Sequence, residues 1–177
     1  MIYCDTMPCT CIILAGGKSL RMRQDKALLF NHVNQLYQQL TELGFTTIIA
    51  CGSQERRDLF DGTCIPDADY VNSLPEAINF FVNSVEGEIQ FFPCDMYLLS
   101  IEAILSILHQ PPGIPVDHTG REQYTLARIP SGMVFSSQPT LRELFAALPR
   151  NDMGEHGIEL TNFNHPEQLH ALNKSNQ

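Results

Sequence analysis

The chain has 177 residues, of which 44% are hydrophobic and 18% charged, and its 11 Lys and Arg against 20 Asp and Glu give a formal net charge of −9 at pH 7. This length supports one sizeable core and is short for two, so we expect a single domain over residues 1–177, with 1–8 as a loose N-terminal extension. The acidic total argues against nucleic acid or a membrane as partner, because phosphate backbones are bound by clustered Lys and Arg.

The apolar runs and the cysteines exclude further classes of protein. The longest runs, 11–15 and the interrupted stretch 101–108, are far shorter than the roughly 18 residues that a membrane-spanning helix needs. Residues 1–8 have neither the basic region nor the hydrophobic stretch of a signal peptide, so we expect a cytoplasmic protein. The six cysteines show no C-x-x-C spacing, which favours buried reduced thiols over disulfides or a zinc site.

Along the chain, short β-rich runs alternate with helical patterns, which is typical of βαβ units around a parallel sheet. The apolar run 9–14 has the pattern of a strand covered on both faces. The expected strands are 9–14, 46–51, 64–65 and 89–92, and the expected helices are 33–43, 73–83 and 100–109. We therefore predict an α/β fold with three layers, a Rossmann-like, mostly parallel central sheet with helices on both faces.

The pattern is less regular after the Pro-rich segment 111–115. We expect extended segments between 116 and 134, with 124–129 the best of them, and a helix over 140–148. A short last strand is expected at 157–160. Asn164 is then expected to cap a closing helix, with Pro166 in its first turn.

The parallel arrangement brings distant residues together. Crossover connections between parallel strands place all the carboxyl ends of the strands along one rim of the sheet, where open α/β folds bind their ligands. Gly16-Gly17, Gly52, Asp67 and Asp95 each follow a predicted strand. We therefore expect them to line one crevice.

The first motif at this rim is Leu14-Ala-Gly-Gly-Lys-Ser-Leu-Arg-Met-Arg-Gln-Asp-Lys26. Two glycines after a buried strand let the backbone approach a ligand, and exposed N–H groups in such a loop bind phosphate. A Walker A loop is rejected, because its first glycine would fall on Ile12. The alternative is a simple turn beside a solvated basic face. Four of the eleven cations, Lys18, Arg21, Arg23 and Lys26, lie in this segment of an acidic chain, which favours an anion site.

The second motif is Phe91-Phe-Pro-Cys-Asp-Met96. Magnesium takes one or two carboxylates together with substrate phosphate oxygens, so Asp95, on the same rim as a phosphate loop, is well placed to hold it. The alternative is an Asp that caps the turn into the next helix. Asp95 alone is weak support for a magnesium site, and its position on the same rim as the first motif strengthens that interpretation.

These residues resemble a known family. The first motif with Ala27-Leu-Leu29, then Pro93-Cys-Asp-Met96 and Asn162-Phe-Asn-His-Pro166, is similar to the molybdenum cofactor guanylyltransferases, which belong to the nucleotidyltransferases. The resemblance covers most of the chain. It implies transfer of GMP from GTP to molybdopterin, with release of pyrophosphate and with Mg²⁺ as cofactor.

The resemblance also implies roles for particular residues. Arg21, Lys26 and Asp95 would be catalytic, the two cations holding phosphates and Asp95 binding the metal. Asn162 and Asn164 would line the molybdopterin side. The nucleotide would contact residues from four segments of the chain: Leu14, Ala15, Gly16, Gly17, Lys26, Asp67 and Asp95, with Asp67 facing the guanine.

Several positions depart from the family pattern, chiefly around the nucleobase. The family's Gly-Pro-Leu-Ala-Gly segment is Asn72-Ser-Leu-Pro-Glu76 here, and the segment between Leu29 and Val33 is short. Two alternatives therefore stay open: another nucleotidyltransferase, of cytidylyl or sugar-phosphate type, and a non-catalytic relative that binds nucleotide or a molybdenum-cofactor maturation protein. The presence of both Lys26 and Asp95 favours an enzyme.

Overall fold

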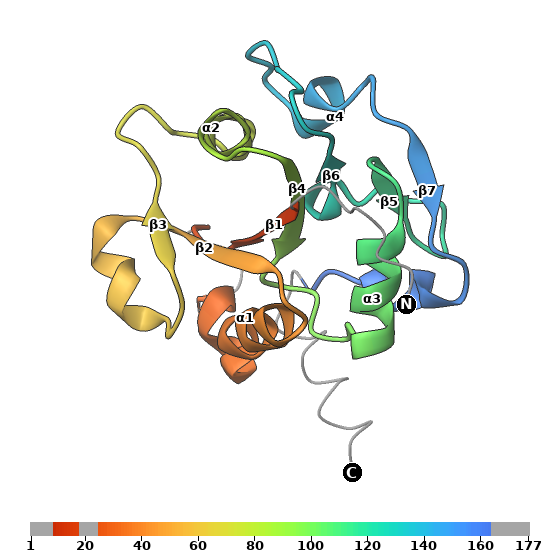
Figure 1. Cartoon of the computed structure of the whole chain (residues 1–177), viewed down its shortest axis with the longest axis horizontal. Coiled ribbons are helices and arrows are strands. Elements are labelled where there is room, and N and C mark those ends of the chain that lie inside the picture. The colour runs from red at the N-terminus through yellow and green to blue at the C-terminus, as the bar shows by residue number, and fades with distance from the viewer. Residues whose placement is uncertain (1–8, 18–24, 164–177) are drawn as a thin grey trace.

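The computed structural model describes residues 9–17 and 25–163, and a five-stranded sheet lies at its centre (Figure 1). The strand order is β3-β2-β1-β4-β6. The first four are mutually parallel and β6 pairs antiparallel with β4. The strands are β1 Cys9–Leu14, β2 Thr46–Gly52, β3 Cys64–Pro66, β4 Glu88–Pro93 and β6 Arg128–Ile129.

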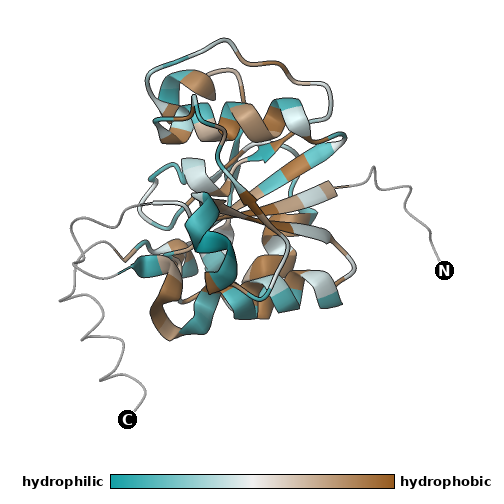
Figure 2. Ribbon diagram, turned by 90° about the vertical axis from the view of Figure 1, so that its left-hand side faces the viewer, coloured by the Kyte–Doolittle hydropathy of each residue, from teal (hydrophilic) through white to brown (hydrophobic). Residues whose placement is uncertain are grey.

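Helices cover both faces of this sheet. On one face α1 (His32–Glu42) and α3 (Ile101–His109) pack against β1, with Ile13 in the shared core. On the other face α2 (Leu74–Ser84) and α4 (Leu141–Leu144) pack over Ile12 and Phe91. Figure 2 shows the hydrophobic strands between the two helical layers. The predicted three-layer, Rossmann-like α/β fold is confirmed.

Short polar side chains start the helices. Ser73 and Ser100 precede α2 and α3, and their hydroxyls accept from the backbone N–H groups of Glu76 and Ala103. These bonds satisfy N–H groups that have no partner within the helix. At the other end of α1, Gly44 takes a φ of +89°, a conformation that favours glycine and stops the helix. The helix starts predicted at residues 73 and 100 are confirmed.

The second half of the chain adds a smaller sheet. It consists of two parallel strands, β5 (Ile114–Val116) and β7 (Arg150–Asp152), neither of which the sequence predicts. Short 3-10 helices connect the larger elements: η1 Lys26–Asn31, η2 Gln54–Leu59, η3 Tyr124–Leu126 and η4 Gly154–Leu160. None of the helices in the described part of the chain is long and apolar enough to cross a membrane. The cytoplasmic location stays a prediction.

Two expectations for this half are confirmed only in part, because strand β6 occupies just 128–129 of the extended segment 124–129 and helix α4 just the start of 140–148, and a third is wrong. Residues 124–126 are helical rather than extended, because the Leu126 N–H closes a turn onto the carbonyl of Gln123 at 2.9 Å. The helix predicted over 140–148 ends at Leu144, after which the chain continues in turns. The segment 157–160 lies in η4 rather than in a strand. The closing helix expected at Asn164 lies outside the described residues.

Candidate active site

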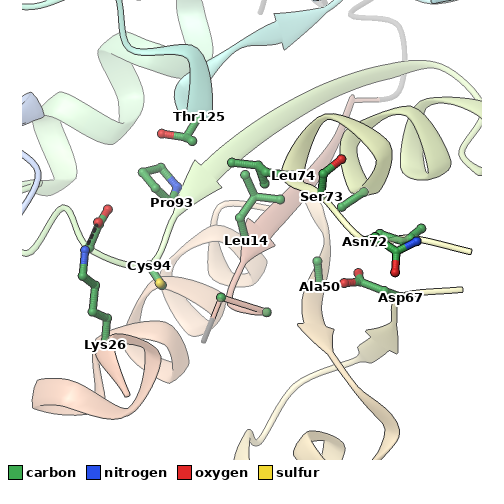
Figure 3. Close-up of a pocket in the computed structure, with 15 residues that line it drawn as sticks. Leu14, Lys26, Ala50, Asp67, Asn72, Ser73, Leu74, Pro93, Cys94 and Thr125 are labelled. Atoms are coloured by element: carbon green, nitrogen blue, oxygen red, sulfur yellow. Dashed lines mark hydrogen bonds and ion pairs between the residues drawn. The ribbon is translucent and has the colours of Figure 1, made fainter. Parts of the chain in front are cut away.

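A cavity of about 590 Å³ lies at the carboxyl ends of the central strands, where the parallel arrangement predicts a ligand site (Figure 3). Residues from several segments of the chain line it. Leu14 and Gly16-Gly17 come from the end of β1, Ala50 from β2, Pro93–Asp95 from the end of β4 and Thr125 from η3. Asp67 and the segment from Val71 to Leu74 form the opposite side, and Lys26 lies across from them. The cavity therefore has two ends, a Lys26 end and an Asp67 end.

The two glycines of the first motif do different things. A Cβ on Gly16 would lie 2.7 Å from the Cα of Gly52, so the loops after β1 and β2 touch through bare backbone. Gly52 has a φ of +87°. A Cβ on Gly17 would meet no described atom within 4 Å. Gly16 is thus required by packing, whereas Gly17 leaves space open at the cavity.

Lys26 and Asp95 meet at one end of the cavity. The Lys26 Nζ lies 2.9 Å from Asp95 Oδ2, and the two side chains are 13% and 16% exposed. The backbone on both sides is held as well: the Tyr97 hydroxyl donates to the Lys26 carbonyl at 3.0 Å, and the Phe163 N–H donates to the Asp95 carbonyl at 3.1 Å. The sequence places these residues 69 positions apart, and the structure brings them into one ion pair.

The other end of the cavity is built around Asp67. Its backbone N–H donates to the Gly52 carbonyl at 2.9 Å, which fixes it to the end of β2. Burial raises the pKa of the Asp67 carboxyl. The neighbouring segment lacks the glycines of the family pattern. It is held by a hydrogen bond from the Asn72 N–H to the Glu76 carboxylate at 2.7 Å and by the Ser73 cap of α2.

Asn162 does not line the cavity but belongs to a chain of polar side chains beside it. Its Nδ2 donates to Gln123 Oε1 at 2.7 Å, and Gln123 Nε2 donates to Asp117 Oδ2 at 2.7 Å. Gln123 is buried. The next residue, Phe163, holds the Asp95 backbone, so Asn162 lies one residue from the Lys26 end. Arg21 and Asn164, predicted as site residues, lie outside the described residues, as do Lys18 and Arg23.

Two buried groups near Asp95 are uncharged at neutral pH. Burial raises the pKa of the Cys94 thiol to about 12, which agrees with the expected inert thiol. Burial lowers the pKa of His32 to about 4, with Asp95 opposing the shift. The His32 ring packs edge-on to Tyr97, and its Nε2 has no partner among the described atoms. Cys94 lies in the second motif of the sequence, whereas His32 belongs to no recognisable spacing and is not predicted.

The site offers one carboxylate for a metal ion. In the described residues no three His, Cys, Asp or Glu side chains converge on a common point, so a cage made wholly of protein ligands is absent there. Magnesium needs only one or two carboxylates when phosphate oxygens and water complete its shell. Asp95 meets this condition, because it supplies one carboxylate at the end of the cavity where Lys26 lies, with the Lys26 Nζ 2.9 Å from its Oδ2. The residues present fit a magnesium ion that arrives with a nucleotide.

Comparison with known families identifies the domain. The model of the MobA-like NTP transferase domain matches residues 11–152, most of the chain. The chain belongs to this family. The matched range contains Gly16-Gly17, Lys26, Asp67 and Asp95, and ends before Asn162. No curated protein matches significantly.

Solved structures agree on the fold of this MobA-like NTP transferase. The molybdopterin-guanine dinucleotide biosynthesis protein A of Archaeoglobus fulgidus has a TM-score of 0.71 at 14% identity, over 93% of this chain and 97% of that one. A protein of Aquifex aeolicus VF5 has a TM-score of 0.67 at 18% identity, over 87% and 92%. A nucleotidyl transferase of Methanothermobacter thermautotrophicus has a TM-score of 0.60 at 12% identity, over 94% and 96%. At these identities the likeness concerns the fold alone.

Proposed function

We propose that the protein transfers GMP from GTP to the terminal phosphate of molybdopterin, forming the guanine dinucleotide and releasing pyrophosphate, with Mg²⁺ as cofactor. The observation that carries this proposal is the Lys26–Asp95 pair at 2.9 Å, beside Gly16-Gly17 and across the cavity from Asp67. A cation and a carboxylate at one end of the cavity, with the Asp67 carboxyl at the other, suit a nucleoside triphosphate bound along the cavity. Family membership supports nucleotidyl transfer in general.

In this reaction an oxygen of the acceptor phosphate attacks the α-phosphorus of GTP in line. The new P–O bond replaces the bond between the α-phosphorus and the bridging oxygen, which leaves with pyrophosphate. The protein contributes position and charge rather than covalent chemistry. Lys26 binds phosphate oxygens and stabilises the charge that develops on the leaving group, and Arg21 does the same from the basic loop.

Asp95 would hold the magnesium ion, which would supply positive charge that stabilises the negative charge of the phosphates. Leu14, Gly16 and Gly17 line the cavity and face the nucleotide, whereas Ala15, predicted as a contact, is fully buried between them. The open space at Gly17 lets a phosphate approach the backbone. The Lys26–Asp95 contact keeps both charged groups at the same end of the cavity, so no large rearrangement is needed when the nucleotide and metal bind.

Asp67 accepts from the guanine N1 and N2 hydrogens, an arrangement that uracil and cytosine cannot offer in the same geometry. Asn162 and Asn164 contact the molybdopterin. The hydrogen bonds from Asn162 through Gln123 to Asp117 fix the orientation of the Asn162 amide, and the next residue, Phe163, binds the Asp95 backbone. A transient contact with molybdenum-cofactor maturation proteins would deliver or collect the cofactor.

The test incubates the purified protein with Mg²⁺, molybdopterin and each nucleoside triphosphate in turn, and measures pyrophosphate. We expect release with GTP. Release with CTP alone would replace the guanylyl assignment by a cytidylyl one, and no release with any triphosphate would leave only the non-catalytic reading. Omitting molybdopterin is the control that separates transfer from hydrolysis of the triphosphate.

A further inference from the structure

Arg56 is a residue that neither the motifs nor the proposed reaction uses, yet it makes the densest set of polar contacts near the cavity. It lies in η2, just after β2. Its Nε donates to the Cys51 carbonyl at 2.8 Å and its Nη2 donates to the Ala15 carbonyl at 2.7 Å. Its Nη1 pairs with the Asp25 carboxylate. All three nitrogens of one guanidinium are therefore used.

Each of the three partners directly precedes a residue of the site. Ala15 precedes Gly16, Cys51 precedes Gly52, and Asp25 precedes Lys26. Gly16 and Gly52 are the two glycines whose backbones touch. Arg56 therefore fastens the ends of β1 and β2 to each other and fastens both to the residue before Lys26.

Asp25 passes this restraint on to the turn that carries Lys26. Its Oδ1 accepts from the Ala27 N–H at 3.1 Å, and its backbone carbonyl accepts from the Leu28 N–H at 3.1 Å. Its other carboxylate oxygen, Oδ2, binds Arg56. The carboxylate thus caps η1 and holds the guanidinium at the same time, so a shift of Arg56 would move the first turn of η1.

We propose that Arg56 is a positioning residue, which sets the place of Lys26 relative to the Gly16-Gly17 backbone and so prepares the site for a triphosphate. This inference rests on the proposed function for its catalytic consequence, although the restraint itself does not. The polar link between the first motif and η2 runs over more than thirty residues of chain. A displacement of about 1 Å in a catalytic group can cost about 10²-fold in rate, so such a restraint matters more for rate than for folding.

The geometry of the guanidinium favours positioning over simple stabilisation. The three bonds need the planar fork of a guanidinium, which a lysine ammonium cannot replace. The guanidinium carbon of Arg56 also lies over the Phe60 ring, 5.8 Å from the ring centroid, and this cation–π contact helps to fix the guanidinium plane.

The first experiment measures the restraint without any nucleotide. Amide hydrogen exchange of the peptide that contains Ala27 and Leu28 is compared between the wild type, Arg56→Ala and Arg56→Lys. Arg57→Ala is the matched control, because Arg57 is the next residue, carries the same charge and is exposed. We expect exchange about tenfold faster in both Arg56 variants and unchanged in Arg57→Ala. Unchanged exchange in Arg56→Ala would overturn the proposal.

The second experiment measures the consequence for phosphate binding and rate. Calorimetry with Mg²⁺ and inorganic tripolyphosphate tests the phosphate end without base or acceptor. We expect binding about tenfold weaker in Arg56→Ala and kcat for transfer 10- to 100-fold lower, with added guanidinium at non-denaturing concentration restoring part of the rate. A merely structural role would lower thermal stability with no rescue and no loss of tripolyphosphate affinity in the folded variant, and that result overturns positioning.

Asp25→Asn separates this proposal from the proposed function. It removes the charge that links Arg56 to η1 but leaves the contacts of Arg56 with Ala15 and Cys51. We therefore expect the logarithm of kcat to fall by about half as much as it does in Arg56→Ala. If the wild type transfers no nucleotide at all while exchange and tripolyphosphate binding respond as expected, the proposed function fails and the positioning by Arg56 stands. If the wild type transfers GMP and the Arg56 variants match it, Arg56 has no positioning role.

Discussion

The two ends of the cavity each present an aspartate, but the two carboxylates are held in opposite ways. Asp95 is paired with Lys26 at 2.9 Å, and the backbone on both sides is fixed by Tyr97 and Phe163. Asp67 lies across the cavity with a fixed backbone and with burial raising the pKa of its carboxyl. The first end has the balanced charges that metal and phosphate chemistry needs. The second has a carboxylate that burial makes more costly to ionise, and in its ionised form both oxygens can accept hydrogen bonds from a base.

The same substitution at the two aspartates tests this contrast, and the larger effect is expected at Asp95. Asp95→Asn removes the charge that holds the metal, so kcat should fall by about 10³-fold, which corresponds to about 4 kcal/mol of transition-state stabilisation. The measurement is pyrophosphate release at saturating GTP and molybdopterin, with circular dichroism to show that the variant is folded. Unaltered turnover in folded Asp95→Asn would remove the metal assignment and leave the two ends without a functional distinction.

The boundary between the two ends is the contact of Gly16 with Gly52. Gly16→Ala would put a methyl group 2.7 Å from the Gly52 Cα, and since both sides are backbone neither can move aside cheaply. We expect a loss of about 2–3 kcal/mol in the free energy of unfolding, measured by urea denaturation. Gly17→Ala is the matched control, since its Cβ would meet no described atom within 4 Å. Its stability should stay within about 0.5 kcal/mol, and any effect should appear in the affinity for triphosphate. Equal destabilisation by both changes would contradict the packing role of Gly16.

The Asp95 end was predictable from the sequence to a much greater extent than its supports were. The apolar run of a buried parallel strand ends abruptly, so Leu14 and Phe92 mark the carboxyl ends of their strands. Because the carboxyl ends of parallel strands lie along one edge of the sheet, Asp95 is expected close to the first motif. Arg56 could not be found in this way. Its partners include the carbonyls of Ala15 and Cys51, and backbone atoms leave no signature in a sequence.

The second half of the chain shows where local patterns fail. β5 is Ile114-Pro-Val116 and β7 is Arg150-Asn-Asp152, too short for any periodicity and, in β7, without an apolar residue. They pair because tertiary contacts bring them together, since residues of such composition have little intrinsic preference for a strand. Residues 124–129 have the composition of a strand, but the turn at Gln123 makes the first three helical.

The smallest expected effect is that of Asp67→Asn, at the Asp67 end of the cavity. This substitution should raise the stability of the protein and weaken its binding of GTP. Because burial raises the pKa of Asp67, the folded state binds the Asp67 proton more tightly than the unfolded state does, and the ionised carboxylate destabilises the folded protein. Asp67→Asn should therefore raise the free energy of unfolding at pH 7, by less than about 1 kcal/mol. This difference should be complete above the raised pKa, shrink as the pH falls through it, and vanish below the ordinary value of 3.8. Urea denaturation at several pH values gives both curves.

The same substitution should weaken the recognition of guanine, since the amide cannot accept from both base hydrogens. We expect KM for GTP to rise about tenfold, the equivalent of one net hydrogen bond of about 1.4 kcal/mol, with kcat almost unchanged. In the wild type KM for GTP should also rise as the pH falls and Asp67 takes up its proton, and Asp67→Asn should lack this dependence. A variant that is more stable but discriminates GTP from CTP as well as the wild type does would show that Asp67 is buried for reasons other than the base. The contrast between the two ends would then rest on Asp95 alone.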